Sequence, residues 1–140
     1  MKDKKFPYEG LALTPSQARK LEALGYQNVR TNTHFVWREG CNIPLGWGLE
    51  TTSKKERYIG DEAAPSITEC LNLLPKAISK DGKSEKVKLC ITKLDGNLWE
   101  ISYGEYYKVS STELMKCVYS TLLWLTTPDF QLNFIKRERA

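Results

Sequence analysis

Cysteine and histidine are the side chains best suited to serve as nucleophiles, bases or metal ligands, and in this sequence they are dispersed. They are Cys41, Cys70, Cys90, Cys117 and His34. A paired cysteine and histidine can form an activated nucleophile, but a single histidine in an aromatic strand pattern is typical of a packed residue. A structural zinc site draws on closely spaced ligands, and no two of these cysteines form a C-x-x-C pair. We therefore expect no catalytic residue, no bound metal and no cofactor.

The sequence also lacks the short motifs of common enzyme classes. It contains no P-loop, no G-x-G-x-x-G, no G-x-S-x-G and no H-E-x-x-H motif. Asp61 and Glu62 precede a predicted helix, where carboxylates interact favourably with the positive end of the helix dipole. We assign them that role rather than acid–base chemistry, and we predict that the protein is not an enzyme.

Cysteine usage and hydropathy indicate a cytoplasmic protein. An even number of cysteines can form disulfides, but only in an oxidising compartment. The stretch from Met1 to Gly10 is charged and has no apolar signal-peptide core. No apolar run approaches the roughly 20 residues that span a bilayer. We therefore expect free thiols and no membrane contact, with Cys70 and Cys117 on apolar helix faces and Cys41 in a loop.

The basic residues gather in one segment, which accounts for the formal net charge of +4. Residues 76–93 contain six lysines against Asp81 and Glu85. Basic residues beside aromatic ones favour nucleic-acid binding, with Trp99 or Tyr103 as a stacking surface. The alternative is that these lysines keep a strand soluble and block edge pairing. The candidate nucleic-acid residues are Lys80, Lys83, Lys86 and Lys88.

Two segments with few secondary-structure signals are unusually apolar and are candidate partner surfaces. One is the loop 40–48 and the other is the tail that follows Pro128. Apolar side chains in such segments must be buried against something, either their own core or another chain. We predict a homodimer contact or an unidentified protein partner here, the competing hypothesis being that the tail completes its own sheet or core. The candidate partner-binding residues are Ile43, Leu45, Trp47, Phe130, Leu132 and Phe134.

Three capping-box patterns predict the helix starts. The first is Thr14 to Gln17, with Pro15 at the first helical position and Gly25 as the C-terminal cap. The second is Ser66 to Glu69, in a helix whose apolar stripe ends with Leu74 and Ile78. Because proline breaks a helix interior, we expect this helix to kink or end near Leu74. The third is Ser110 to Glu113, opening a broadly apolar core helix over residues 112–126.

Strand patterns complete the fold prediction. Residues 31–38, 49–52 and 57–59 are strand candidates, and residues 86–103 predict a hairpin that turns at Asp95–Gly96. The hairpin residues expected to be buried are Val87, Leu89, Ile91, Trp99 and Ile101. The order of elements predicts an α+β fold, an antiparallel sheet with about three helices packed on it. We expect one domain over residues 1–140, with residues 128–140 as an extended tail or part of that core.

Three stretches resemble a loose group of small proteins encoded by phages and mobile elements of gut Bacteroidetes. Residues 13–26 resemble their opening helix, and residues 58–66 resemble the Tyr, small-residue, Ala-Pro-Ser entry to their second helix. The run 73–78, with the hairpin and the Leu122–Leu125 helix, resembles their second half. The group has no assigned activity, so the resemblance implies the α+β architecture and a mobile-element origin but no catalytic residue.

Two function classes follow from these observations. The first is a non-catalytic interaction or accessory module, which self-associates and is of phage or mobile-element origin. The second is a nucleic-acid-binding accessory protein that uses the lysine-rich segment 76–93. Binding that weakens steeply with salt favours the second class, whereas a salt-insensitive dimer favours the first.

The dispersed cysteines predict four free thiols. Titration in denaturant without reductant should count all four cysteines of the chain. A count of two or zero would show that disulfides form and would contradict the expected reducing environment.

Overall fold

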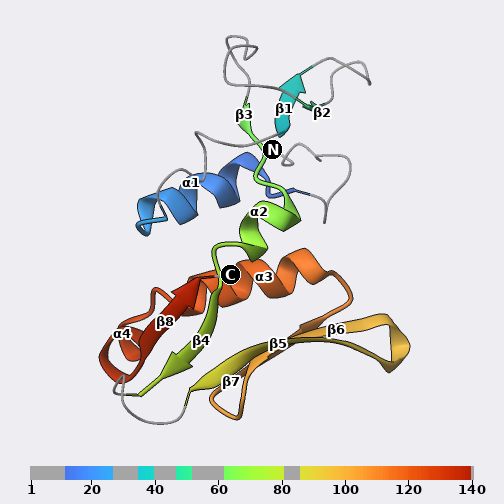
Figure 1. Cartoon of the computed structure of the whole chain (residues 1–140). Coiled ribbons are helices and arrows are strands. Elements are labelled where there is room, and N and C mark those ends of the chain that lie inside the picture. Colours follow the sequence, from blue (N-terminus) through green and yellow to red (C-terminus); the bar gives the residue numbers. More distant parts are fainter. Residues whose placement is uncertain (1–11, 27–34, 40–46, 52–61, 81–85, 140) are drawn as a thin grey trace. The chain divides into compact units, whose positions relative to one another are not determined.

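The computed structural model describes residues 12–26, 35–39, 47–51, 62–80 and 86–139. The chain divides into two compact units, Met1–Glu69 (unit 1) and Cys70–Ala140 (unit 2), and Figure 1 labels their elements. Helices and antiparallel sheets occur together, which confirms the predicted α+β class. The described residues form one sheet in each unit rather than a single sheet. The single domain predicted over residues 1–140 stays a prediction.

The first helix, α1 (Pro15–Ala23), begins and ends as the sequence predicts. The Gln17 amide donates to the Thr14 hydroxyl at 3.3 Å, and the Thr14 amide donates to the Gln17 side chain at 3.0 Å. At the other end Gly25 adopts a φ of +105°. Its amide donates to the Glu22 carbonyl, and the Tyr26 amide donates to the Leu21 carbonyl, both at 3.1 Å. This is the Schellman pattern of a glycine-terminated helix.

A three-stranded antiparallel sheet accompanies α1 in unit 1. Its order is β2-β1-β3, and its strands are β1 (Phe35–Glu39), β2 (Trp47–Thr51) and β3 (Glu62–Ala63). The strands predicted at 31–38 and 49–52 are confirmed where the structure describes them, whereas the one at 57–59 lies outside the described residues. The buried Trp37 ring packs against Ala12 and Ala64, and its Nε1 donates to the Leu13 carbonyl at 2.7 Å. A buried indole N–H needs such a partner, so this bond fixes the ring.

The predicted role of Glu62 is wrong. Glu62 lies in β3, and its carboxylate accepts from the Arg19 guanidinium at 2.8 Å. Asp61 lies outside the described residues. The capping carboxylate of the next helix is Glu69, which accepts from the Ser66 amide at 2.9 Å.

That helix, α2 (Ile67–Leu71), is only five residues long. Its Ser66–Glu69 capping box is confirmed, and it ends three residues before Leu74. Pro75 then opens a strand, so the placement of Ile78 on a helix face is wrong. Ile78 is buried, which an apolar residue can be in either a helix or a strand. Its pairing with Val87 places it in a strand.

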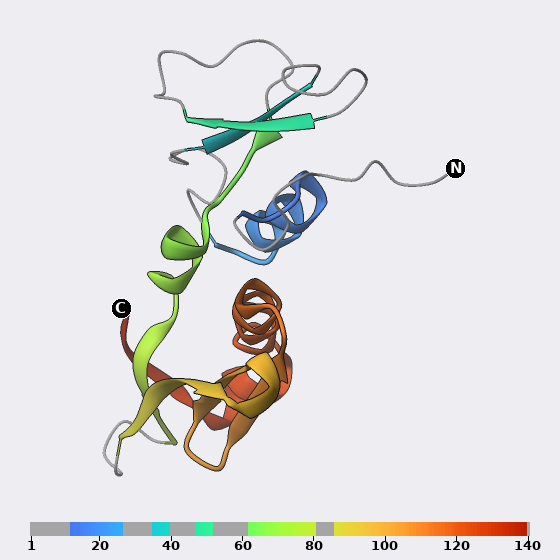
Figure 2. The same ribbon diagram turned by 90° about the vertical axis from the view of Figure 1, so that its right-hand side faces the viewer.

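Unit 2 contains a five-stranded antiparallel sheet with the order β7-β6-β5-β4-β8. The hairpin predicted at 86–103 is confirmed, with Leu89 opposite Tyr103 and a turn over Asp95–Asn97. The sheet curves, and a helix lies on its inner side (Figure 2). The strands are β4 (Pro75–Ser79), β5 (Val87–Leu94), β6 (Leu98–Tyr103), β7 (Tyr107–Ser111) and β8 (Ile135–Arg139).

The third predicted capping box is wrong because Ser110 and Ser111 end strand β7. The helix α3 (Leu114–Trp124) has Glu113 at its N-cap, with no capping bond from that side chain. The Glu113 amide instead donates to the Ser111 hydroxyl at 3.2 Å. Pairing of β7 with β6 therefore prevails over a local helix-start pattern.

Helix α3 is the core helix of unit 2, as predicted. It packs against β6 and β7 and buries Met115, Cys117, Val118 and Leu122. Because it covers β6 and β7 rather than β5, the predicted inner face of the hairpin is buried unevenly. Ile101 is fully buried, whereas Ile91 is 39% exposed, which contradicts its predicted burial. Val87, Leu89 and Trp99 are half-buried.

Pro128 begins an element, although it was expected only to stop one. It occupies the first turn of α4 (Pro128–Asn133), where the Thr127 side chain accepts from the Phe130 amide. Strand β8 follows and pairs with β4. The tail therefore completes the sheet of its own unit, which was the competing hypothesis for this segment.

Truncating the centre of α3 should strongly destabilise the protein. Leu122 is fully buried, so Leu122→Ala should lower the free energy of unfolding by about 2–5 kcal/mol. Ile91→Thr, at an exposed strand position in the same unit, should cost less than about 1 kcal/mol. Denaturant unfolding of both variants measures the difference, and equal losses would contradict a core centred on α3.

Candidate functional site

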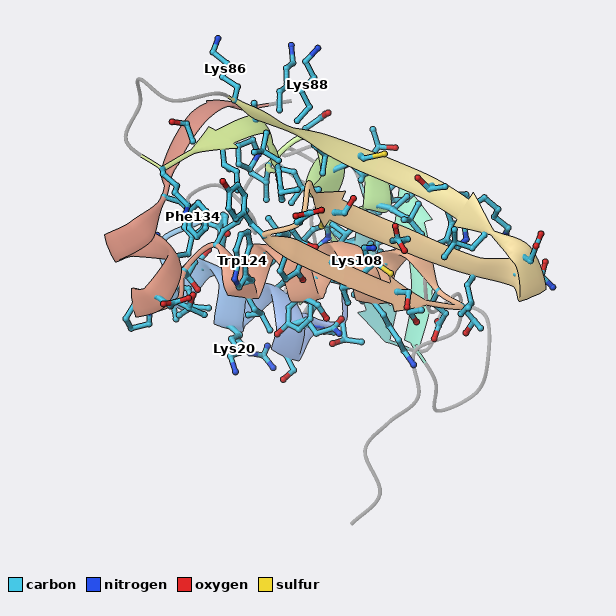
Figure 3. All side chains as sticks on the ribbon, turned by 90° about the horizontal axis from the view of Figure 1, so that it is seen from below. Lys20, Lys86, Lys88, Lys108, Trp124 and Phe134 are labelled. Atoms are coloured by element: carbon cyan, nitrogen blue, oxygen red, sulfur yellow. The ribbon has the colours of Figure 1, made fainter. Side chains whose placement is uncertain are left out.

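One end of the unit 2 sheet gathers the predicted lysines. Strand β4 ends where β5 begins, since Ile78 pairs with Val87 in the antiparallel register. Lys80, which follows β4, and Lys86, which precedes β5, therefore lie at the same end, and both are exposed. Lys88 is exposed one residue into β5, and Figure 3 shows Lys86 and Lys88 projecting in the same direction. Lys83 lies outside the described residues.

The turn between β6 and β7 lies at this same end, because β6 runs antiparallel to β5. It contains Tyr106, whose side chain is 45% exposed. The Nζ atom of Lys80 lies 5.2 Å from the centroid of the Tyr106 ring, a favourable cation–π distance. The Phe134 ring meets the same ring edge-on at 5.1 Å and 65°. We call the group Lys80, Lys86, Lys88 and the turn Gly104–Tyr106 the basic end.

A close backbone approach fixes this turn against β5. Gly104 has a φ of +56°, and a Cβ atom there would lie 2.6 Å from Cγ1 of Val87. Real Cβ atoms do not approach so closely, so only glycine lets the turn lie on Val87. Because side chains alternate across a strand, Lys86 and Lys88 project from the opposite face to Val87, away from Phe134 and Trp124 (Figure 3), so the turn and these lysines share one end of the sheet but not one face.

An aromatic cluster around Trp124 supports the turn from within unit 2. The Tyr107 ring stacks on the Trp124 ring at 4.2 Å, and the Phe130 ring meets it edge-on at 4.8 Å. Phe134 links the cluster to Tyr106 and lies beside Trp124 (Figure 3). Burial raises the pKa of Tyr107 above its ordinary value, and its hydrogen bond with Thr121 opposes that rise.

The stacking residues predicted from sequence differ from the exposed aromatic at the basic end. Tyr103 is fully buried and its hydroxyl donates to the Pro75 carbonyl at 2.7 Å, so its proposed stacking role is wrong. Trp99 is half-buried near the opposite end of β6, where Lys93 Nζ lies 4.4 Å from its ring centroid. Sequence reasoning missed Tyr106, whose place in the Gly-Glu-Tyr-Tyr turn was the available signal.

Negative charge is also present at the basic end. Glu105 is exposed in the turn beside Tyr106, while Asp81 and Glu85 lie outside the described residues. On the first part of β7, Lys108 is exposed and pairs with Ser102. The described side chains of the basic end therefore carry an excess of positive charge.

The candidate partner-binding residues are scattered over both units. Phe130 is 1% exposed and packs inside unit 2, where Phe134 is half-buried. Leu132 lies in α4 and Trp47 begins β2, whereas Ile43 and Leu45 lie outside the described residues. The homodimer contact stays a prediction.

The residues first considered for chemistry are not brought together in the described part of the chain. Cys70 and Cys117 are buried, and Cys90 is exposed on β5. Cys41 and His34 lie outside the described residues. Among those that are described, no group of His, Cys, Asp and Glu side chains suits a metal ion, and no helix has the length and hydropathy to cross a membrane.

Comparisons with known proteins find no match for this chain among family models, curated proteins or solved structures. The geometry of the basic end is therefore the basis for a functional proposal. Its distinguishing features are three exposed lysines at one end of the sheet, an exposed aromatic ring with a lysine over it, and a turn held by glycine.

The close contact of Gly104 with Val87 predicts that a side chain at position 104 destabilises the protein by a steric clash, in addition to any backbone strain. Gly104→Ala should lower the free energy of unfolding by about 2–3 kcal/mol, because strain at positive φ adds to the clash with Val87. Gly96→Ala is the matched control: Gly96 has a φ of +75° but nothing within 4 Å of an added Cβ. It should cost only the strain, about 1 kcal/mol.

A double-mutant cycle measures the clash itself. In a Val87→Ala background the cost of Gly104→Ala should fall towards that of Gly96→Ala, since Cγ1 is gone. Equal costs for the two glycine variants, with no effect of the background, would contradict the close approach.

Proposed function

We propose that this protein is a non-catalytic binding module whose basic end binds nucleic acid. The observation that carries the proposal is the convergence of three separate chain segments on one end of the unit 2 sheet. They contribute Lys80, Lys86 with Lys88, and the exposed Tyr106. Lys80 lies over the Tyr106 ring, and Lys86 with Lys88 adds positive charge at the same end of the sheet; cations and exposed aromatic rings are the usual components of a nucleic-acid surface.

Electrostatic attraction to phosphates supplies most of the affinity in this proposal. Each lysine that neutralises a phosphate releases condensed counterions, so binding weakens as salt rises. Such contacts position the backbone and do not read sequence. The expected behaviour is therefore binding with little sequence preference, opposed in part by the exposed carboxylate of Glu105.

Protection of an edge strand does not explain Lys88. Lysines often protect the edge strands of a sheet from pairing with other chains. Strand β5, however, lies between β6 and β4 in the interior of the sheet. Lys88 therefore protects no edge, which leaves solubility of the exposed strand face as the other explanation.

The predicted protein–protein contact has less support than nucleic-acid binding. Two of its residues, Phe130 and Phe134, pack against the Trp124 ring within unit 2. A nucleic-acid-binding accessory role also accords with the mobile-element origin that the sequence resemblance implies.

The proposal predicts that substituting the three lysines weakens binding. In fluorescence anisotropy with a labelled oligonucleotide at low salt, the triple variant Lys80→Gln, Lys86→Gln, Lys88→Gln should bind at least about tenfold more weakly. The slope of log affinity against log salt should become shallower by about 2–3. Glu105→Gln should bind more tightly, because it removes a like charge from the phosphate path.

Lys93→Gln is the matched control for the lysine variants. Lys93 is exposed on the same sheet but lies at the opposite end, beside the turn Asp95–Asn97. Its substitution should leave the affinity nearly unchanged. Salt-independent binding, or equal losses in control and triple variant, would overturn the proposal.

A further inference from the structure

We infer that Tyr106 is a base-stacking platform and that the basic end therefore prefers single-stranded over double-stranded nucleic acid. This inference rests on the proposed function and adds the class of nucleic acid that the site selects. Large hydrophobic side chains that are exposed within the described residues are Leu24, Ile91 and Tyr106. Of these, Tyr106 alone has a ring on which a base can stack.

The Tyr106 ring is held in place before any ligand arrives. Phe134 meets it edge-on at 5.1 Å, and Phe134 stacks in turn on the buried Phe130 at 5.4 Å. The contact between Gly104 and Val87 fixes the backbone two residues earlier. Ordering such a ring on binding costs little conformational entropy, so stacking contributes nearly its full value.

Lys80 makes this ring a composite site. Its Nζ atom lies 5.2 Å from the ring centroid and its side chain is exposed. A base that stacks on this face takes the place of the Lys80 ammonium, and the flexible lysine then turns to the phosphate of the same nucleotide. The cation and the ring thus bind two parts of one nucleotide, the phosphate and the base.

The faces of bases are available in single strands and are covered by neighbours within a duplex. Tyr106 can therefore add affinity for a single strand, whereas the lysines attract the phosphates of both forms. Removing the ring should reduce single-strand binding alone, and removing the lysines should reduce both. This difference separates the inference from the proposed function.

The test uses the full chain with three probes of equal length: a single strand, a duplex and a single strand of abasic sugar-phosphate. Tyr106→Ala should weaken binding to the normal single strand roughly 5- to 100-fold. Its affinity for the duplex and the abasic strand should change less than about twofold. Tyr106→Phe keeps the ring and should bind all three probes nearly as the unsubstituted protein does.

Two outcomes would overturn the inference. Equal losses for Tyr106→Ala on all three probes would mean that the ring only supports the turn. No loss on the single strand would mean that no base stacks on it. Failure of the proposed function gives a different pattern, in which the lysine variants bind every probe as well as the unsubstituted protein.

Discussion

The antiparallel register between β5 and β6 is the constraint on which the candidate site depends. Because Leu89 lies opposite Tyr103, the start of β5 and the turn after β6 must meet at one end of the sheet. The turn then lies so close to Val87 that residue 104 can have no side chain. A register shift of one residue would move every side chain of β5 to the other face, and Val87 would lose its contact with Gly104. The site is thus a consequence of strand pairing rather than of a local motif.

The core of unit 2 maintains that register. Helix α3 covers β6 and β7, while the Tyr103 hydroxyl reaches the Pro75 carbonyl and so connects β6 with β4. The aromatic cluster around Trp124 then extends through Phe134 to the exposed Tyr106 ring. One continuous set of contacts therefore runs from the buried helix to the surface of the basic end. Packing inside unit 2 therefore holds the Tyr106 ring in place at the surface, and base stacking requires a ring held in this way.

Structural features that depend on residues close together in the sequence were predictable. The capping boxes at Thr14 and Ser66 and the hairpin turning at Asp95–Gly96 all form as expected, because each is decided within a few residues. The pattern at Ser110 looks the same as the other two boxes. It fails because β7 pairs with β6, a contact that no local pattern encodes.

The candidate site was predictable only in part, for the same reason. The lysines were visible as a charged segment, but whether an aromatic residue lies beside them depends on partners distant in sequence. Tyr103 is buried because its hydroxyl meets Pro75, and Tyr106 is exposed but held because Phe134 supports it. Strand β8 and helix α4 were not predicted. The apolar residues of the tail are equally compatible with burial in its own sheet and with burial against a partner, and the sequence pattern does not distinguish the two.

Mapping the bound surface residue by residue tests the central claim most directly. Backbone amide chemical shifts recorded during titration with a single-stranded oligonucleotide should change most at Lys80, Lys86 to Lys88 and Gly104 to Tyr106. The opposite end of the sheet, at Asp95–Asn97, should change little. Changes centred on that opposite end or on unit 1, or no saturable change at low salt, would contradict nucleic-acid binding by the basic end.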